Sequence, residues 1–214
     1  MTLSGPSQNP LSGSNPKSVC IMLHGIGADG DNLIGLADAF APDFPDTYFI
    51  APNGPERFVG GGGYQWFPYY DRSREQILQG LEKAAQTISE FATQLLDRFE
   101  LKPENLILMG FSQGAMVAIH TAITMQDNCA ATVAFSGGLI KVEITKFEVR
   151  SQPPICLIHG EYDDVVPFQM SETSAKILSG HHVPTEFHKI KGLGHSIDMG
   201  GIDIAKGFLQ KVLK

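Results

Sequence analysis

The sequence predicts an α/β protein with a mostly parallel central sheet and helices on both faces. First, short apolar runs alternate with longer segments of helical periodicity from about residue 18 to the end of the chain, a pattern typical of parallel sheets. Second, the 214 residues are 43% hydrophobic and 18% charged, which is enough for a large core. Third, no internal repeat or linker divides the chain, which favours one domain.

The predicted elements follow in order along the chain. Strands are expected where continuous apolar runs end at turn residues, over 18–25, 47–55, 105–110, 131–137, 154–160 and 185–191. Helices are expected where apolar residues recur at steps of three and four or fill the gaps between strands, over 31–41, 77–99, 113–125, 167–178 and 201–213.

Two segments stand outside this alternation. Residues 1–16 are rich in Ser, Gly, Pro and Asn and are predicted to form a flexible tail, which leaves 17–214 as a single domain. Residues 54–75 hold four consecutive glycines, the only tryptophan and several other aromatic residues. They have no regular period, so we expect a long, lid-like loop.

Composition limits the classes of function. The net charge is −7 and the isoelectric point is about 5.4, which disfavours nucleic acid and anionic membranes as partners. The N-terminus lacks the pattern of a secretory signal, and no run reaches the roughly 18 apolar residues of a membrane span. We therefore expect a cytoplasmic location. Cys20, Cys129 and Cys156 form neither a disulfide framework nor a zinc-ligand pattern.

The stretch Gly110-Phe111-Ser112-Gln113-Gly114 follows an apolar strand and precedes a helix. Glycines two residues before and after a serine allow the tight turn that exposes a nucleophile above the end of a strand. An ordinary strand-to-helix turn uses the same residue types, but the surrounding strand and helix favour Ser112 as a nucleophile.

A serine nucleophile needs a histidine base and a carboxylate downstream of it. His195 lies in a glycine-rich segment between the last strand and the last helix, which is the expected place for the base. The other downstream histidines fit less well: His159, His181, His182 and His188. We expect His159 to order the loop of the acid through hydrogen bonds. Spacing alone does not choose between Asp163 and Asp164 as the carboxylate.

Acyl transfer also needs two backbone N–H donors for the developing oxyanion. The N–H of Gln113 follows the nucleophile, and the loop after the first long strand supplies Ile26 as the second donor. The Gln113 side chain is expected to matter little. A metal-dependent hydrolase using His159, Asp163 and His195 is a rival reading, but no metal-ligand motif supports it.

The aromatic residues of the 54–75 loop could contact an acyl chain or pack the loop itself, and the sequence leaves both readings open. These residues are Phe58, Tyr64, Trp66, Phe67, Tyr69 and Tyr70. Trp66 and Phe67 are the substrate-binding candidates. Exposed aromatic residues on this loop would also be compatible with a homodimer.

Taken in order, the motifs LHGIGADGDNL, APNGP, GFSQGAMVA, FSGGL, HGEYDDVVP and GLGHSI resemble the phospholipase/carboxylesterase family of α/β-hydrolases. The resemblance covers the chain from about Val19. It implies the α/β-hydrolase fold, a triad of Ser112, Asp163 and His195, and the oxyanion donors Ile26 and Gln113. No metal or organic cofactor is implied.

The resemblance also bears on the substrate. Pro68 follows Trp66-Phe67 where thioesterase members carry an acid, and this loop looks more like that of bacterial carboxylesterases. We therefore expect a serine carboxylic-ester hydrolase that acts on small or medium acyl esters, whether small molecules or lipids. An acyl-protein thioesterase or lysophospholipase is the alternative, and a non-catalytic hydrolase-fold binding protein is the alternative of another class.

Overall fold

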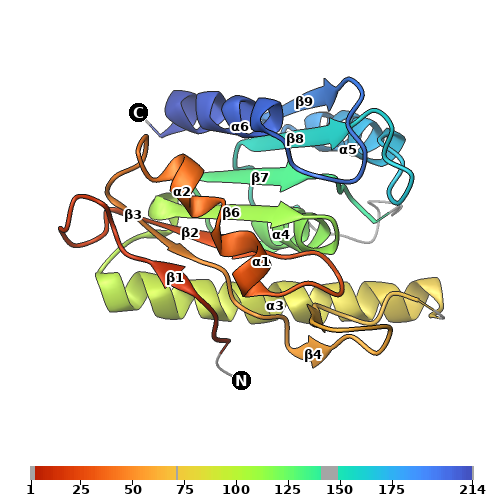
Figure 1. The fold of residues 1–214 in the computed structure, drawn as a ribbon, viewed down its shortest axis with the longest axis horizontal. Coiled ribbons are helices and arrows are strands. Elements are labelled where there is room, and N and C mark those ends of the chain that lie inside the picture. The colour runs from red at the N-terminus through yellow and green to blue at the C-terminus, as the bar shows by residue number, and fades with distance from the viewer. Residues whose placement is uncertain (1–2, 71, 141–148, 214) are drawn as a thin grey trace.

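Seven strands form one central sheet in the computed structural model, which describes residues 3–70, 72–140 and 149–213 (Figure 1). Their order is β1-β3-β2-β6-β7-β8-β9, and every neighbouring pair is parallel except β1 with β3. The strands are β1 (Ser7–Gln8), β2 (Ser18–Leu23), β3 (Thr47–Ile50), β6 (Leu106–Phe111), β7 (Ala131–Phe135), β8 (Ile155–Gly160) and β9 (Thr185–Ile190). The predicted α/β class with a mostly parallel sheet is confirmed.

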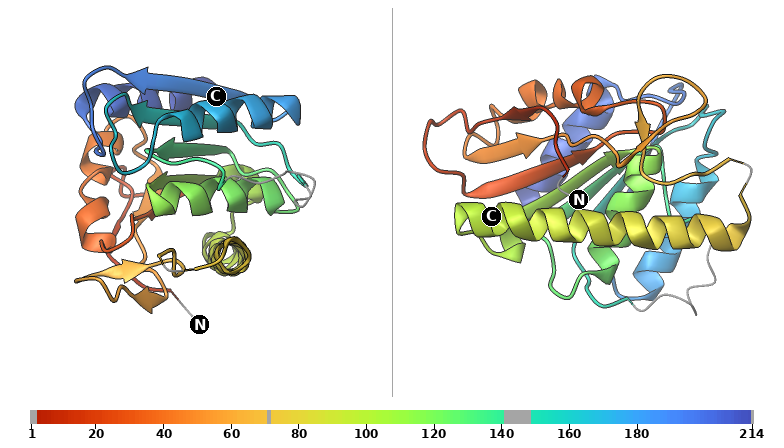
Figure 2. Two further views of the ribbon diagram at one scale, coloured as in Figure 1. Left: turned by 90° about the vertical axis from the view of Figure 1, so that its right-hand side faces the viewer. Right: turned by 90° about the horizontal axis from the view of Figure 1, so that it is seen from below.

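Helices cover both faces of the sheet, as Figure 2 shows. On one face lie α3 (Arg74–Phe99), α4 (Gln113–Thr124) and α5 (Gln169–Gly180); on the other lie α1 (Gly30–Ile34), α2 (Ala37–Phe40) and α6 (Met199–Val212). A short 3₁₀ helix, η1 (Pro103–Asn105), precedes β6. In β2, Val19, Ile21 and Leu23 face α3 and α4, whereas Cys20 and Met22 face the opposite layer. Because successive side chains of a strand alternate, a continuous apolar run supplies both layers of the core.

The N-terminal segment differs from the expected flexible tail. Leu3 is buried, and β1 pairs with β3 through Ser7 and Gln8. The N–H of Asn53 also donates to the carbonyl of Ser4 at 2.9 Å. The physical reason is that β3 would otherwise present unpaired backbone groups at the edge of the sheet, and even a turn-rich segment can supply partners for them.

The helix expected over 31–41 is divided into α1 and α2. Gly35 follows α1, and the N–H of Leu36 bonds to the carbonyl of Leu33 in a tighter turn. Glycine is a weak helix former, which favours a break at this position. The predicted helix over 77–99 is confirmed as α3, which begins one turn earlier with a capping box at Ser73.

The 54–75 segment contains a two-stranded hairpin, β4 (Glu56–Arg57) with β5 (Tyr64–Gln65). This segment lies against the loop after β2, because Tyr64 exchanges backbone hydrogen bonds with Gly27 and Ala28 at 2.8 and 2.7 Å. The hairpin thus joins the expected lid-like loop to the carboxyl edge of the sheet. Across the described ranges, no helix has both the length and the apolar character required to cross a membrane.

Candidate active site

Ser112 lies between β6 and α4 in a backbone conformation that serine rarely adopts. Its φ is 54° and its ψ is −118°, and such strain is typical of functional turns. The glycines on either side are required by space: a Cβ at Gly110 would collide with the backbone of Gly114, and one at Gly114 would collide with that of Leu23. The N–H of Ser112 is tied to the carbonyl of Phe135 at 2.9 Å. The turn therefore fixes the serine at the carboxyl edge of the sheet.

His195 links this serine to the acid loop. Its Nε2 lies 3.0 Å from Ser112 Oγ, and its Nδ1 lies 2.7 Å from Asp163 Oδ2. Because a carboxylate only accepts, Nδ1 carries the hydrogen and Nε2 is free to accept from the serine hydroxyl. The imidazole also packs on the Phe111 ring, with centroids 4.8 Å apart. The structure thus brings together three residues that come from the loops after β6, β8 and β9.

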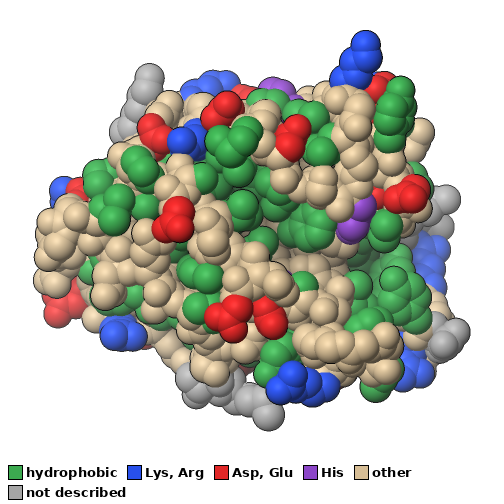
Figure 3. All heavy atoms as spheres, viewed as in Figure 1, with side chains coloured by type: hydrophobic (Ala, Val, Ile, Leu, Met, Phe, Trp, Pro, Cys, Tyr) green, Lys and Arg blue, Asp and Glu red, His purple; other side chains and the backbone are tan. Residues whose placement is uncertain are grey.

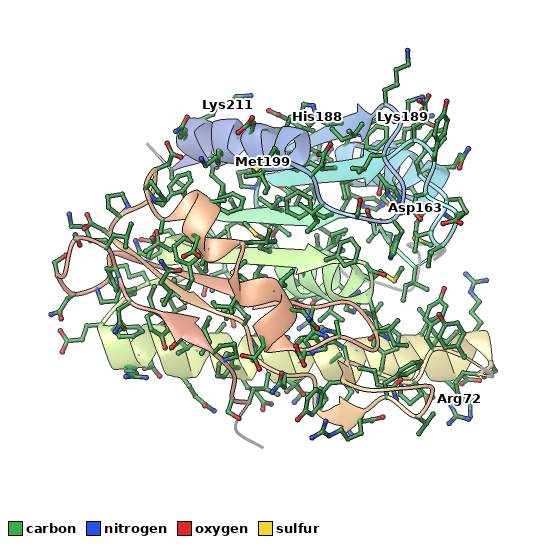
Figure 4. All side chains as sticks on the ribbon, viewed as in Figure 1. Arg72, Asp163, His188, Lys189, Met199 and Lys211 are labelled. Atoms are coloured by element: carbon green, nitrogen blue, oxygen red, sulfur yellow. The ribbon has the colours of Figure 1, made fainter. Side chains whose placement is uncertain are left out.

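Asp163 is buried and fully hydrogen-bonded, and Figure 4 labels it at the edge of the sheet toward which the parallel strands point. Its Oδ1 accepts from the N–H groups of Val165 and Val166 at 3.0 and 2.8 Å. Burial opposes ionisation of Asp163, but the hydrogen bonds from His195 and from these N–H groups outweigh it and lower the pKa of the carboxyl. Asp164, the alternative that spacing left open, is exposed.

The remaining downstream histidines lie elsewhere. His181 and His182 are exposed at the end of α5, and His188 in β9 contacts Glu186 at 3.3 Å. His159 is buried at the end of β8, and its Nε2 lies 3.0 Å from Asp163 Oδ2, so the expected hydrogen bond to the acid loop is confirmed. Among the residues that the structure describes, no three His, Cys, Asp or Glu side chains form a group that could hold a metal ion.

The loop after β2 approaches the serine closely. A Cβ built on Gly25 would come within 3.3 Å of Ser112 Cβ, and Ile26 and Gln113 line the same pocket as Ser112. His24 holds this loop: its Nδ1 lies 2.7 Å from the carbonyl of Gly25, and its Nε2 accepts from the N–H of Gly54 at 2.9 Å. Ile26 and Gln113, the two expected oxyanion donors, therefore lie around the same cavity as Ser112.

The side chain of Gln113 is buried and connects two segments, contrary to the expectation that it matters little. Its Oε1 accepts from the N–H of Trp66 at 2.9 Å, and its Nε2 donates to the carbonyl of Phe67 at 2.8 Å. Sequence reasoning missed this bridge. The available signal was an amide at the start of an otherwise apolar helix, since a buried amide needs partners.

A cavity of about 160 Å³ opens beside Ser112. Its lining residues are Ile26, Tyr69, Tyr70, Ser112, Gln113, Met116, Val165, Val166, Pro167 and Met170. In Figure 3, hydrophobic side chains gather beside a hollow at the right of the molecule, on the side where the strands end. The lining is thus mostly apolar, and its polar side-chain groups are the hydroxyls of Ser112, Tyr69 and Tyr70 and the amide of Gln113.

The prediction that Trp66 and Phe67 bind substrate is not supported, because neither residue lines this cavity. Their exposed fractions are 2% and 1%, and both pack in the core layer under α3. The indole N–H of Trp66 donates to the carbonyl of His24 at 2.8 Å. Because they are buried in the core and Trp66 is held by this bond, the two aromatic residues anchor the loop and do not face the cavity. Tyr69 and Tyr70 line the cavity instead.

The chain is similar in sequence and fold to proteins named as thioesterases and esterases. Acyl-protein thioesterase 1 of Saccharomyces cerevisiae is 30% identical over 220 residues, which cover 92% of this chain and 93% of that protein. The crystal structure of esterase PE8 is 40% identical with a TM-score of 0.93, and the match covers 99% of this chain and all of that one. The Bacillus cereus carboxylesterase, at 18% identity and a TM-score of 0.80, shares the fold. The family model described as Phospholipase/Carboxylesterase matches residues 11–213, and the chain belongs to this family of α/β-hydrolases.

Proposed function

We propose that Ser112, His195 and Asp163 are the catalytic triad of this serine carboxylic-ester hydrolase. The observation that carries the proposal is the continuous hydrogen-bonded chain from Ser112 Oγ through His195 to Asp163, at 3.0 and 2.7 Å. Three loops far apart in the sequence supply these groups, and the order Ser, Asp, His along the chain is that expected for this fold.

In the proposed reaction, Ser112 Oγ attacks the acyl carbonyl carbon while His195 Nε2 takes the hydroxyl proton. The bond from the carbonyl carbon to the leaving oxygen or sulfur then breaks, and His195 returns the proton to the leaving group. Water repeats the sequence on the acyl-enzyme and releases the carboxylic acid and free Ser112. Asp163 accepts from Nδ1 throughout and stabilises the imidazolium that forms in each half.

The N–H groups of Ile26 and Gln113 are the proposed oxyanion hole. Support comes from their common position on the cavity with Ser112, and from the α4 N-terminus, whose first residue is Gln113 and whose dipole favours negative charge. One donor of this kind is typically worth about 2.7–4 kcal/mol of barrier. Because both groups belong to the backbone, side-chain variants do not test them directly.

The proposed substrates are esters of small or medium acyl groups. Support comes from the cavity beside Ser112, which has a volume of about 160 Å³ and a mostly apolar lining. Thioester hydrolysis is the second candidate, since relatives of similar length are named acyl-protein thioesterases. A panel of p-nitrophenyl esters of rising chain length, beside an acyl-CoA and a lysophospholipid, separates these substrate classes.

A fluorophosphonate probe tests the nucleophile. We expect it to label the wild type and not the Ser112→Ala variant, which should lose ester turnover by roughly 10⁴-fold or more. Ser179→Ala, which changes an exposed serine at the end of α5, is the matched control and should keep labelling and activity. Activity of Ser112→Ala close to that of the wild type would refute the assignment.

The remaining expectations stay predictions. We propose that 17–214 act as one domain, to whose sheet β1 adds an edge strand, with a lid-like segment at 54–75, and that the location is cytoplasmic. A homodimer through exposed aromatic residues of this segment is supported by Tyr70, whose exposed fraction is 58%. Analytical ultracentrifugation of the wild type and of Tyr70→Ser tests it, and a wild-type monomer at micromolar concentration would exclude the dimer.

A further inference from the structure

His159 is a buried titratable group that the proposed mechanism does not use. It is the last residue but one of β8, and its exposed fraction is 1%. Its Nε2 lies 3.0 Å from Asp163 Oδ2 and 2.8 Å from the carbonyl oxygen of Val166. Its Nδ1 lies 2.6 Å from Ser171 Oγ, which in turn lies 2.6 Å from the carbonyl oxygen of Gly137.

These contacts decide where the imidazole carries its hydrogen. A carboxylate and a carbonyl only accept, so Nε2 between Asp163 and Val166 must be an N–H donor. The hydroxyl of Ser171 has one hydrogen and two acceptors beside it. When that hydrogen points to Nδ1 the ring is neutral, and when it points to Gly137 the ring holds a hydrogen on both nitrogens. In either state the single Nε2–H is shared between Asp163 Oδ2 and the carbonyl oxygen of Val166.

Asp163 Oδ2 therefore accepts from two imidazoles, His195 at 2.7 Å and His159 at 3.0 Å. An oxygen that accepts two N–H groups offers less negative charge to each of them. The strength with which Asp163 holds a proton on His195 then depends on His159, although His159 touches neither the substrate cavity nor Ser112 in the contacts described.

We propose that His159 is a positioning residue for the ester hydrolysis, extending the hydrogen-bonded chain beyond Asp163 to Ser171. It shares Asp163 Oδ2 with His195 and so keeps His195 in its proton-accepting form at lower pH than Asp163 alone would allow. The inference rests on the proposed function, because it assumes that His195 is the base.

The surroundings of His159 support a stable N–H at Nε2. The titratable groups that act on His159 are Asp163, from the loop after β8, and His195, from the loop before α6. Helix α5 adds the hydroxyl of Ser171, and the segment after β7 adds the carbonyl of Gly137; neither is charged. Burial lowers the pKa of His159, while the Val166 carbonyl and Asp163 oppose this effect.

Two variants separate donation from packing. His159→Gln places an amide N–H where Nε2 lies and keeps a donor for Asp163, whereas His159→Leu fills space without a donor. The rate constant kcat/KM is measured against pH, with enzyme concentration set by fluorophosphonate titration of active sites. We expect the acid limb of His159→Leu to move to higher pH by roughly half a unit or more, and that of His159→Gln to stay near the wild type.

A purely structural role predicts a different result. Misfolding lowers the number of titrated sites but leaves the pH midpoint of the remaining enzyme unchanged, and an unmoved midpoint in folded His159→Leu overturns the inference. If the wild type shows no acid limb where histidines ordinarily titrate, near about 6.5, the proposed base itself fails. The two failures are therefore distinguishable.

A measurement on the wild type covers the case in which His159→Leu does not fold. Nitrogen-15 labelling of the histidines and long-range ¹⁵N–¹H correlation spectra report which ring nitrogen carries hydrogen. The His159 signals are assigned by their loss in His159→Gln. We expect a protonated Nε2 throughout the pH range of activity, and a bare Nε2 with hydrogen on Nδ1 alone would contradict the inference.

Discussion

The two walls of the active-site cavity are built from different interactions. On one wall, the loops after β6, β8 and β9 hold Ser112, Asp163 and His195, and Asp163 alone accepts four hydrogen bonds. On the other wall, the lining side chains make aromatic and apolar contacts, such as Tyr69 with Tyr70 at 5.8 Å between ring centroids. We call the first the triad wall and the second, formed by Tyr69, Tyr70, Met116 and Met170, the acyl wall.

Each wall should tolerate a different kind of change. Hydrogen bonds between buried groups depend on the position and charge of single atoms. Replacing one atom on the triad wall should therefore lower kcat strongly. Apolar contacts depend on volume and are individually weak. A change on the acyl wall should therefore alter which acyl chain fits more than whether the reaction proceeds.

Asp163→Asn, on the triad wall, should be the most damaging of these changes. The amide can present an N–H to His195 Nδ1, which then favours the wrong tautomer and leaves the imidazolium without a carboxylate. In a comparable serine hydrolase triad such a change lowers kcat by about 10⁴-fold. Steady-state kinetics with a p-nitrophenyl ester measure the loss.

Asp164→Asn is the matched control, because it makes the same chemical change at the exposed neighbour. We expect its kcat to lie within a fewfold of the wild type. If Asp164→Asn were the more damaging of the two variants, the assignment of the carboxylate to Asp163 would have to be withdrawn.

The second effect concerns Gln113, which joins the turn at Ser112 to the 54–75 segment. Its backbone belongs to the nucleophile turn, and its side chain holds Trp66 and Phe67 at the base of the 54–75 segment. In Gln113→Leu, a buried N–H and a buried carbonyl lose their partners, at about 1–3 kcal/mol each. We expect the free energy of unfolding in urea to fall by about 2–4 kcal/mol, with a loss of kcat/KM.

Gln86→Leu provides the comparison for this variant. Gln86 donates to Glu90 on the exposed side of α3, and surface changes of this kind usually stay within about 0.5 kcal/mol. If the two variants lost the same free energy of unfolding, the buried hydrogen bonds of Gln113 would stabilise the protein no more than an exposed one does.

The same contrast explains which features were predictable from the sequence. The strands β2, β6, β7 and β8 are continuous apolar runs, and the order of the motifs predicts that Ser112 and His195 lie close together, as the structure has them at 3.0 Å between Oγ and Nε2. Such signals are local, since a tight turn needs glycine and a buried strand needs apolar residues.

The acyl wall and the sheet edge were not predictable in this way. Trp66 and Tyr69 are equally aromatic in the sequence, and tertiary packing alone decides that the first is buried and the second reaches the cavity. Likewise, nothing in the composition of Ser7 and Gln8 marks them as a strand, because their partner β3 supplies the reason for pairing.

The third effect lies on the acyl wall. Met170 lies at the start of α5 and lines the cavity beside Ser112, so Met170→Ala should lengthen the space for the acyl chain. One methylene in an apolar pocket is worth about 10-fold or more in selectivity. We expect the ratio of kcat/KM for a longer ester over a shorter one to rise about 10-fold.

Met199→Ala is the control, because Met199 is exposed at the start of α6. It should leave the chain-length profile unchanged. A tenfold fall in the activity of Met170→Ala toward all esters alike would instead mean that Met170 supports the geometry of the triad wall and not the size of the acyl pocket.

The weakest expected effect concerns protonation of two buried histidines, His159 in β8 and His24 directly after β2. His159, behind the triad wall, can take a second hydrogen at Nδ1 because Ser171 can turn its hydroxyl away. His24, which holds the loop after β2, has no such freedom, because its Nε2 accepts from the N–H of Gly54 and its Nδ1 faces the carbonyl of Gly25. Protonation of His24 must therefore break the bond to Gly54.

Acid should accordingly loosen, through His24, the hydrogen bond between the loop after β2 and Gly54. Burial lowers the pKa of His24, while the Gly25 carbonyl and Asp29 oppose the shift. Because the folded value lies below the unfolded one, this contribution to stability is complete above about pH 6.5 and is lost as the pH falls through the folded value. Trp66 reports the change, since it is the only tryptophan and its ring lies 5.1 Å from His24.

We expect a small, reversible change in tryptophan fluorescence below about pH 6.5 in the wild type. It should disappear in His24→Gln, whose side-chain oxygen can accept from Gly54 but cannot titrate. His159→Gln should keep the change, because the hydrogen-bond contacts of His159 are with Asp163, Val166 and Ser171. If the fluorescence change disappeared in His159→Gln and persisted in His24→Gln, acid would act on Trp66 through His159. The assignment of the change to His24 would then be wrong.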